Sequence, residues 1–144
     1  MPTLALLLAL APWTPRSDAE LSAALQTTCA ASLADKKPIL LQFSAAWCGD
    51  CRAAETLKAD PAVSAALQQW HTLLIDVGRF ERHQPMLQAF GATGIAWWVA
   101  LAPTDCAQPV TAWPRLKVGA IEPSSDATLS QPAALVGWLQ SARR

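Results

Sequence analysis

Residues 38–57 read PILLQFSAAWCGDCRAAETL, and they are the most informative part of the chain. Its apolar beginning predicts a buried strand, and its end has the composition of a helix. Cys48 and Cys51 therefore lie at a strand-to-helix turn, separated by two residues. At such a turn the helix dipole and free backbone N–H groups stabilise a thiolate on Cys48, and Cys51 follows one helical turn later. This spacing is typical of a dithiol that exchanges with a disulfide.

Helix and strand patterns alternate along the rest of the chain. Strand-like apolar runs cover 39–44, 71–77, 95–101 and, more weakly, 115–120. Helical spacing of apolar residues covers 20–34, 48–70, 85–90 and 135–142. The second of these regions is broken at Asp60 and Pro61, where Asp60 is a cap and Pro61 takes the first helical position. We find no internal repeat and no second domain. The order α-β-α-β-α-β-β-α implies a mixed sheet covered by helices on both faces.

This order, with the cysteine pair at the first strand-to-helix turn, resembles the thioredoxin family. The match runs from about Glu20 to Ala142, and its best local pieces are LQFSAAWCGDC at 41–51 and FGATGI at 90–95. The stretch DVGRFER at 76–82 looks like bacterial thioredoxin-like proteins of the periplasmic disulfide-reductase kind. The resemblance implies an α/β, thioredoxin-like three-layer sandwich, with a central mixed four-stranded sheet between helices. It also implies a thiol-disulfide oxidoreductase.

Two residues depart from the family pattern. Thioredoxins usually carry a buried aspartate on the first central strand, where this chain has Gln42, so water or another group must move the proton of the resolving thiol. The family also carries a cis-proline before the third strand, and here that position is Ala96. Because a cis bond before a non-proline residue costs roughly 3–4 kcal/mol, we expect a trans Ile95–Ala96 bond and an altered substrate-docking edge.

The catalytic roles follow from the order of the two cysteines. Cys48, as the exposed member, is the predicted nucleophile, and Cys51 is the predicted resolving thiol. We expect Trp47 to pack against the turn and shield the sulfurs. The residues expected to support the site are Trp47, Gly49, Asp50 and Ala96.

The interior of the motif predicts the direction of the chemistry. Asp50 places a negative charge near the Cys48 sulfur, and this charge opposes the thiolate. Arg52 offsets it only in part, because an exposed charge is well screened. A less stabilised thiolate makes the couple more reducing. We therefore expect a reductase that needs no cofactor and receives electrons from another thiol protein.

Two other classes of function stay open. Cys48 and Cys51 have the spacing of metal or iron–sulfur ligands, and a dimer sharing two such pairs could complete a site, although the spacing of His71 and His83 does not pair them with the cysteines. The chain could also be a non-catalytic binding module that uses its aromatic surface. Seven tryptophans are many for 144 residues.

Adjacent tryptophans on a strand, Trp97 and Trp98, point to opposite faces of the sheet. We favour the interpretation that both lie in a central strand buried on both faces.

The remaining cysteines allow two interpretations. Cys29 lies on an apolar stripe with Leu25 and Leu33, as a buried thiol would, and Cys106 lies in a turn where it would be accessible. In a thioredoxin-like topology, however, the first helix and the third strand both end at the pole far from the dithiol. A Cys29–Cys106 disulfide is therefore possible.

Charge and composition limit the partners. Lys+Arg and Asp+Glu balance at 11 each, so no basic field predicts a nucleic-acid partner. A hydrophobic content of 52% and a charged content of 15% indicate a folded domain with a real core. We expect a monomer whose partners are protein thiols and disulfides, including a thiol-protein electron donor.

The N-terminus predicts export. Residues 4–11 read LALLLALA, which is too short to span a bilayer but suits a secretory signal, and Ser17 and Ala19 are small residues suited to a signal peptidase. No Lys or Arg precedes the run, so the alternative is a short buried element in a cytoplasmic protein. We expect residues 1–19 to be a signal peptide, 20–144 to be the domain, and the mature protein to be periplasmic or secreted, without a stable membrane span.

Overall fold

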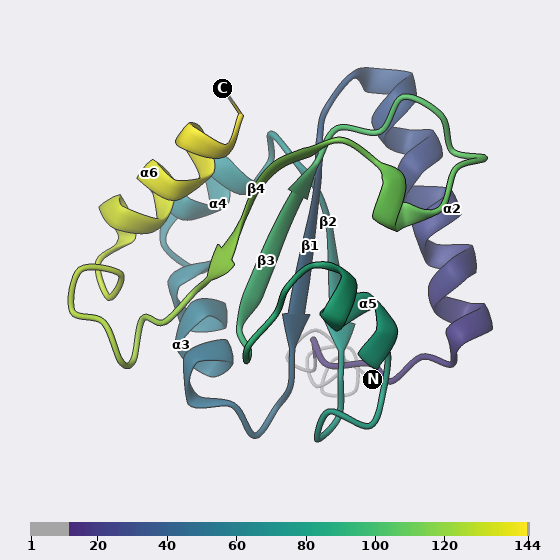
Figure 1. The fold of residues 1–144 in the computed structure, drawn as a ribbon. Helices are drawn as coiled ribbons and strands as arrows, with labels where there is room; N and C mark the ends of the chain where they lie inside the picture. Colours follow the sequence, from purple (N-terminus) through teal and green to yellow (C-terminus); the bar gives the residue numbers. More distant parts are fainter. Residues whose placement is uncertain (1–11, 144) are drawn as a thin grey trace, which may run out of the picture.

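The computed structural model describes residues 12–143 and contains one four-stranded sheet (Figure 1). The strand order is β2-β1-β3-β4. β1 pairs in parallel with β2 and antiparallel with β3, and β3 pairs antiparallel with β4. The strands are β1 (Ile39–Ser44), β2 (His71–Asp76), β3 (Trp97–Leu101) and β4 (Arg115–Ala120). The predicted mixed four-stranded sheet is confirmed.

Helices cover both faces of this sheet (Figure 1). One face carries α2 (Asp18–Asp35) and α5 (Gln84–Ala89), and a short 3-10 helix, η1 (Val110–Ala112), lies in the β3–β4 connection. The other face carries α3 (Gly49–Leu57), α4 (Pro61–Leu67) and α6 (Pro132–Ala142). The architecture is the predicted three-layer sandwich, and no helix in residues 12–143 has the length and apolar character to cross a membrane.

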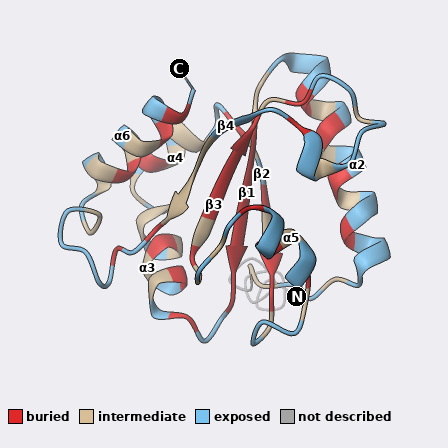
Figure 2. Cartoon of the chain, in the orientation of Figure 1, coloured by how far each residue is buried: buried red, intermediate tan, exposed pale blue. Residues whose placement is uncertain are grey.

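The buried residues gather in the central strands and in parts of the helices (Figure 2). Alternation along the strands divides this core into two layers. In β1, Ile39, Leu41 and Phe43 face α2, whereas Leu40 packs in the layer that contains the cysteine pair. The adjacent tryptophans divide as predicted, because Trp98 is buried in the cysteine layer and Trp97 packs against the opposite one. Trp97 is only partly buried, which corrects the expectation of full burial for both.

The helix α2 begins two residues earlier than predicted because a capping box fixes its start. The Ser17 hydroxyl accepts a hydrogen bond from the Glu20 N–H at 3.1 Å, and the Glu20 carboxylate accepts one from the Ser17 N–H at 2.9 Å. Hydrogen bonding from Ser17 lowers the pKa of the Glu20 carboxyl, the backbone N–H of Ser17 first and its hydroxyl second. Upstream of α2, the Trp13 indole N–H donates a hydrogen bond to the Ser44 hydroxyl, and the Arg16 guanidinium donates one to the Leu74 carbonyl, both at 2.9 Å.

The predicted apolar signal run, residues 4–11, lies outside the described residues.

A disulfide joins Cys29 of α2 to Cys106 in the β3–β4 connection. Its sulfurs are 2.04 Å apart and its Cα atoms 5.8 Å apart. Cys29 is fully buried, and Cys106 is partly buried against the same core layer. The possible second disulfide is confirmed, and the alternative of a free Cys29 and an accessible Cys106 is wrong. The bond ties a connection that contains little regular structure to the longest helix.

Candidate active site

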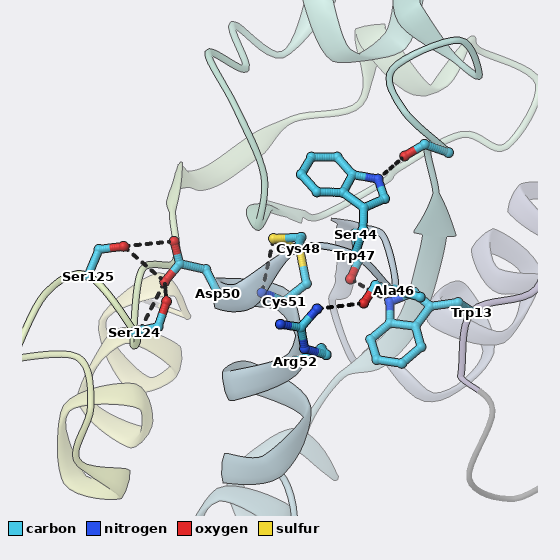
Figure 3. Close-up of a disulfide and its surroundings, with 11 residues drawn as sticks. Trp13, Ser44, Ala46, Trp47, Cys48, Asp50, Cys51, Arg52, Ser124 and Ser125 are labelled. Atoms are coloured by element: carbon cyan, nitrogen blue, oxygen red, sulfur yellow. Dashed lines mark hydrogen bonds between the residues drawn. A yellow bond between two sulfur atoms is a disulfide. The ribbon is translucent and has the colours of Figure 1, made fainter.

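The cysteine pair lies where β1 passes into α3 (Figure 3). Cys48 is the N-cap residue of α3, and its sulfur accepts a hydrogen bond from the Cys51 N–H at 3.1 Å. A disulfide joins the two sulfurs. When this disulfide is reduced, the Cys48 sulfur remains at a helix N-terminus, where backbone N–H groups and the helix dipole favour a thiolate.

The two cysteines differ less in solvent exposure than predicted. Cys48 is 5% exposed and Cys51 is 1% exposed, so Cys48 is the more accessible sulfur but is not an exposed residue. Both pack in the core layer that contains Ala96 and Trp98. The expectation of an exposed Cys48 is wrong in degree, because a residue beside a turn can still be covered by distant parts of the chain.

The Ile95–Ala96 peptide bond is cis, so the prediction of a trans bond is wrong. The prediction used only the local preference of a non-proline residue. In the fold, Ala96 is buried in the same cluster as both cysteines, and its carbonyl accepts a hydrogen bond from the Ile121 N–H at 2.9 Å. The local preference on which the prediction relied takes no account of such contacts with distant residues. The expectation of an altered docking edge depended on a trans bond and no longer holds.

Gln42 is buried beneath α3 and contacts a charged pair that the sequence analysis missed. Its Oε1 accepts a hydrogen bond from Lys58 Nζ at 2.9 Å, and Lys58 also pairs with Glu55 at 2.5 Å. Gln42 Nε2 has no hydrogen-bond partner among residues 12–143. The signal was present in the sequence, because Cys51, Glu55 and Lys58 recur at i, i+4 and i+7 and so share one face of a helix.

Asp50 faces a loop, an arrangement that sequence reasoning did not anticipate. Its carboxylate accepts hydrogen bonds from the Ser124 N–H at 2.9 Å, the Ser124 hydroxyl at 2.5 Å and the Ser125 hydroxyl at 3.2 Å (Figure 3). The loop between β4 and α6 is thereby anchored to the first turn of α3. Gly49 opens that turn, and a Cβ atom there would meet the Ser124 hydroxyl at an ordinary 3.7 Å. The Asp50 charge therefore has a fixed position inside the motif.

Trp47 packs against the segment after β2, and 42% of its surface is exposed. Its indole N–H donates to the Gly78 carbonyl at 2.7 Å, and its ring meets Phe80 edge-on at 5.7 Å between centroids. Next to Phe80, the pKa of Glu81 is lowered by hydrogen bonds from backbone N–H groups, its own first and that of Arg79 second. Arg52 donates to the Ala46 carbonyl at 2.9 Å, which holds the turn before Cys48.

The histidines lie away from the cysteine pair. His71 pairs with Asp35 at 2.8 Å, and His83 pairs with Asp18 at 3.0 Å. Within residues 12–143, His, Cys, Asp and Glu side chains form no group of three or more that could hold a metal ion. The arrangement at Cys48 and Cys51 is chemically suited to thiol–disulfide exchange.

Comparison with known proteins gives structural similarity only. No protein-family model matches the chain, and no curated protein sequence matches it. A disulphide isomerase from Xylella fastidiosa Temecula1 superposes with a TM-score of 0.69 at 22% identity, over 92% of this chain and 97% of its own. The oxidised DsbD C-terminal domain of Neisseria meningitidis gives 0.63 at 22% identity, over 90% and 100%. A thioredoxin from Thermus thermophilus gives 0.56 at 20% identity, over 81% and 79%. The chain therefore has a thioredoxin-like fold, with its cysteine pair at the first strand-to-helix turn.

Proposed function

We propose that the protein is a thiol-disulfide oxidoreductase that exchanges its Cys48–Cys51 dithiol with cysteine pairs of other proteins. The observation that carries the proposal is the position of the Cys48 sulfur, which caps α3 and is bonded to Cys51 in a thioredoxin-like fold. An equilibrium redox titration of the purified protein, followed by a protein-disulfide reduction assay, tests it. A Cys48–Cys51 pair that does not cycle between dithiol and disulfide would contradict it.

The reaction has two exchange steps. The Cys48 thiolate attacks one sulfur of the substrate disulfide, forms a mixed disulfide and releases the first substrate thiolate, which takes a proton from water. The Cys51 thiolate then attacks the Cys48 sulfur, which reforms the Cys48–Cys51 bond and releases the second substrate thiolate. The substrate gains two electrons and the dithiol loses two. A thiol-protein donor restores the dithiol by the same exchange in the opposite direction.

Proton transfer from Cys51 needs a group other than the usual aspartate. The Gln42 amide cannot act as an acid or a base at neutral pH. Its Oε1 accepts a hydrogen bond from Lys58, which also donates to Glu55, and both of these side chains carry ionisable groups. This pair lies on the same face of α3 as Cys51. We assign the Lys58–Glu55 pair as the first candidate for moving the proton of Cys51, the role that the buried aspartate has in thioredoxins. Water is the other candidate.

The direction of the reaction is proposed to be reductive. Asp50 lies inside the motif, and the hydrogen bonds from Ser124 and Ser125 hold its negative charge in place. A fixed negative charge near the sulfur disfavours the Cys48 thiolate and so favours a reducing couple. A wild-type reduction potential as high as about −120 mV, that of a strong oxidant, would contradict this argument.

Asp50→His is expected to raise the reduction potential by about 30 mV or more, equivalent to at least a tenfold change in the exchange equilibrium. The substitution replaces a charge that opposes the thiolate with a group that can carry a positive one. Titration against a glutathione redox buffer measures the shift. Two control variants separate the causes. Asp50→Asn removes the charge but keeps the shape, and Ser124→Ala weakens the loop anchor but keeps the charge. If Ser124→Ala changes the reduction potential as much as Asp50→His does, the change in potential comes from loss of the loop anchor and not from the charge of Asp50.

Export is proposed from the apolar run 4–11 and is supported by the Cys29–Cys106 disulfide, because structural disulfides persist in oxidising compartments. Mass spectrometry of the protein made with its natural N-terminus is expected to show removal of roughly the first 19 residues. The measurement also locates the cleavage relative to the Ser17 cap of α2, which cleavage after Ala19 would remove. A cytoplasmic product beginning at Met1 or Pro2 would contradict export.

A further inference from the structure

A hollow of about 390 Å³ lies between α2, α5 and η1. The helices α2 and α5 cover the face of the sheet opposite to α3, which carries the cysteine pair (Figure 1). The wall of the hollow includes Leu21 and Leu25 of α2, Met86 of α5, and Trp113, which follows η1. Small-molecule sites in proteins are commonly hollows of this size with mainly apolar walls.

The apolar wall is suited to an aromatic ring. Trp113 is buried, and its indole N–H donates to the Gln108 carbonyl at 3.1 Å, so this side chain offers the hollow no free polar group. Met86 is only partly buried, and an unbranched methionine side chain changes its shape easily. Both the face of an indole and a thioether sulfur make favourable contacts with aromatic rings.

One polar group in this wall has no partner. The His83 side chain is 3% exposed, and its Nδ1 lies 3.0 Å from the Asp18 carboxylate. Its Nε2 is buried and has no hydrogen-bond partner in the part of the chain that the structure describes. Because a carboxylate can only accept a hydrogen bond, Nδ1 holds the proton of the neutral ring and Nε2 keeps a lone pair. A buried acceptor without a donor is unfavourable, so a ligand that donates to Nε2 gains affinity there.

The charges around the hollow favour an uncharged ligand. Among the described residues that line it, Asp18 alone carries a full charge, and its carboxylate already pairs with His83. The remaining polar side chains of the wall, Ser22, Gln26 and Gln108, are neutral. An anion would be repelled by Asp18, and a cation would leave water for a carboxylate that is already paired.

We propose that this hollow binds a small uncharged aromatic alcohol, whose hydroxyl donates to Nε2 of His83 while its ring packs against Trp113. Because Nε2 is covered in the structure, the ligand reaches it when the adaptable Met86 side chain gives way. The hollow and the Cys48–Cys51 pair belong to different core layers, so the inference does not depend on the proposed function.

The test is a titration followed by the NMR signal of the Met86 methyl group. The chain has two methionines, Met1 and Met86, so full-length protein labelled with carbon-13 at the methionine methyl groups gives a simple spectrum. The probes are 4-ethylphenol, ethylbenzene, which lacks the hydroxyl, and 4-ethylbenzoate, which is an anion. We expect 4-ethylphenol to bind about tenfold more tightly than ethylbenzene or better, the effect of one hydrogen bond to a buried acceptor. 4-Ethylbenzoate should bind more weakly than 4-ethylphenol.

A substitution of His83 assigns this preference to its ring nitrogen. His83 has a φ of 58°, and His83→Asn removes the imidazole with a residue that tolerates this left-handed backbone. The affinity ratio of 4-ethylphenol to ethylbenzene is expected to fall below about threefold. His71→Asn is the matched control, because His71 also pairs with an aspartate, Asp35, but lies outside the wall of the hollow. It should keep the wild-type ratio.

A second pair of variants tests the location and avoids any change to His83. Ser22 is an exposed residue of α2 that lines the hollow, so Ser22→Phe should block it and weaken both uncharged probes at least about tenfold. Ala23, the next residue of α2, is also exposed but does not line the hollow. Ala23→Phe should therefore leave both affinities unchanged.

Each remaining outcome would overturn a stated part of the inference. Equal affinities for 4-ethylphenol and ethylbenzene, or an unchanged ratio in His83→Asn, would overturn the hydrogen bond to His83. Tighter binding of 4-ethylbenzoate than of 4-ethylphenol would overturn the uncharged class of ligand. The site itself fails if neither uncharged probe gives a saturable shift of the Met86 signal, or if Ser22→Phe binds both as the wild-type protein does. Cys48→Ser should bind 4-ethylphenol normally, so a failure of the exchange activity would leave the site unaffected.

Discussion

Replacing Cys48 with serine is expected to reduce protein-disulfide reduction to the level of a protein-free control. A serine hydroxyl stays protonated at neutral pH and cannot form the mixed disulfide, so the first exchange step is lost. The helix N-terminus, which favours the thiolate of Cys48, gives the hydroxyl no comparable reactivity. The rate of reduction of a disulfide-bonded protein, with an excess of a dithiol donor, is the measurement.

Cys51→Ser is the matched variant, because it removes a sulfur from the same turn but leaves the nucleophile. It should form the mixed disulfide and then stop, so a covalent adduct equal in mass to protein plus substrate is expected to accumulate. Accumulation of that adduct in Cys48→Ser instead would reverse the two roles. Full activity in both variants would mean that the reduction does not depend on the Cys48–Cys51 pair, and would contradict the proposed function.

The sheet and its layers could be predicted because they follow from local patterns. The apolar run of β1 is buried on both faces, and its observed bounds, Ile39–Ser44, are those predicted. The bounds of β4 also match, whereas β3 begins at Trp97, two residues later than predicted, because Ile95 and Ala96 form the connection that contains the cis bond. Strand periodicity carries no information on where such a connection ends.

The surroundings of the dithiol could be predicted only in part, because they depend on contacts between distant residues. Asp50 and Ser124 are 74 residues apart, and neither residue indicates the other in the sequence. Trp47 and Gly78 are 31 apart, and their contact requires the parallel pairing of β1 and β2. The Cys29–Cys106 disulfide was left open for the same reason, since a cysteine in an apolar stripe is compatible with a free thiol or a disulfide.

Removing the Cys29–Cys106 disulfide is expected to lower the free energy of unfolding by about 3–5 kcal/mol. The two cysteines are 77 residues apart, so the bond removes much conformational freedom from the unfolded chain. Because small domains have total stabilities of about 5–15 kcal/mol, this loss is a large fraction of the whole. Guanidinium denaturation of the Cys29→Ala, Cys106→Ala double variant, with the wild-type protein as reference, measures it.

A control separates the bond from the side chains, because Cys29 is fully buried and its truncation also leaves a small cavity. The single variant Cys106→Ala breaks the bond without truncating Cys29, so it should lose most of the stability that the double variant loses. The reduction potential of Cys48–Cys51 should change little in both variants, since Cys29 packs in the core layer on the opposite face of the sheet. A loss below about 1 kcal/mol in Cys106→Ala would contradict the chain-entropy argument. A large shift in potential would mean instead that the bond acts on the dithiol through the sheet.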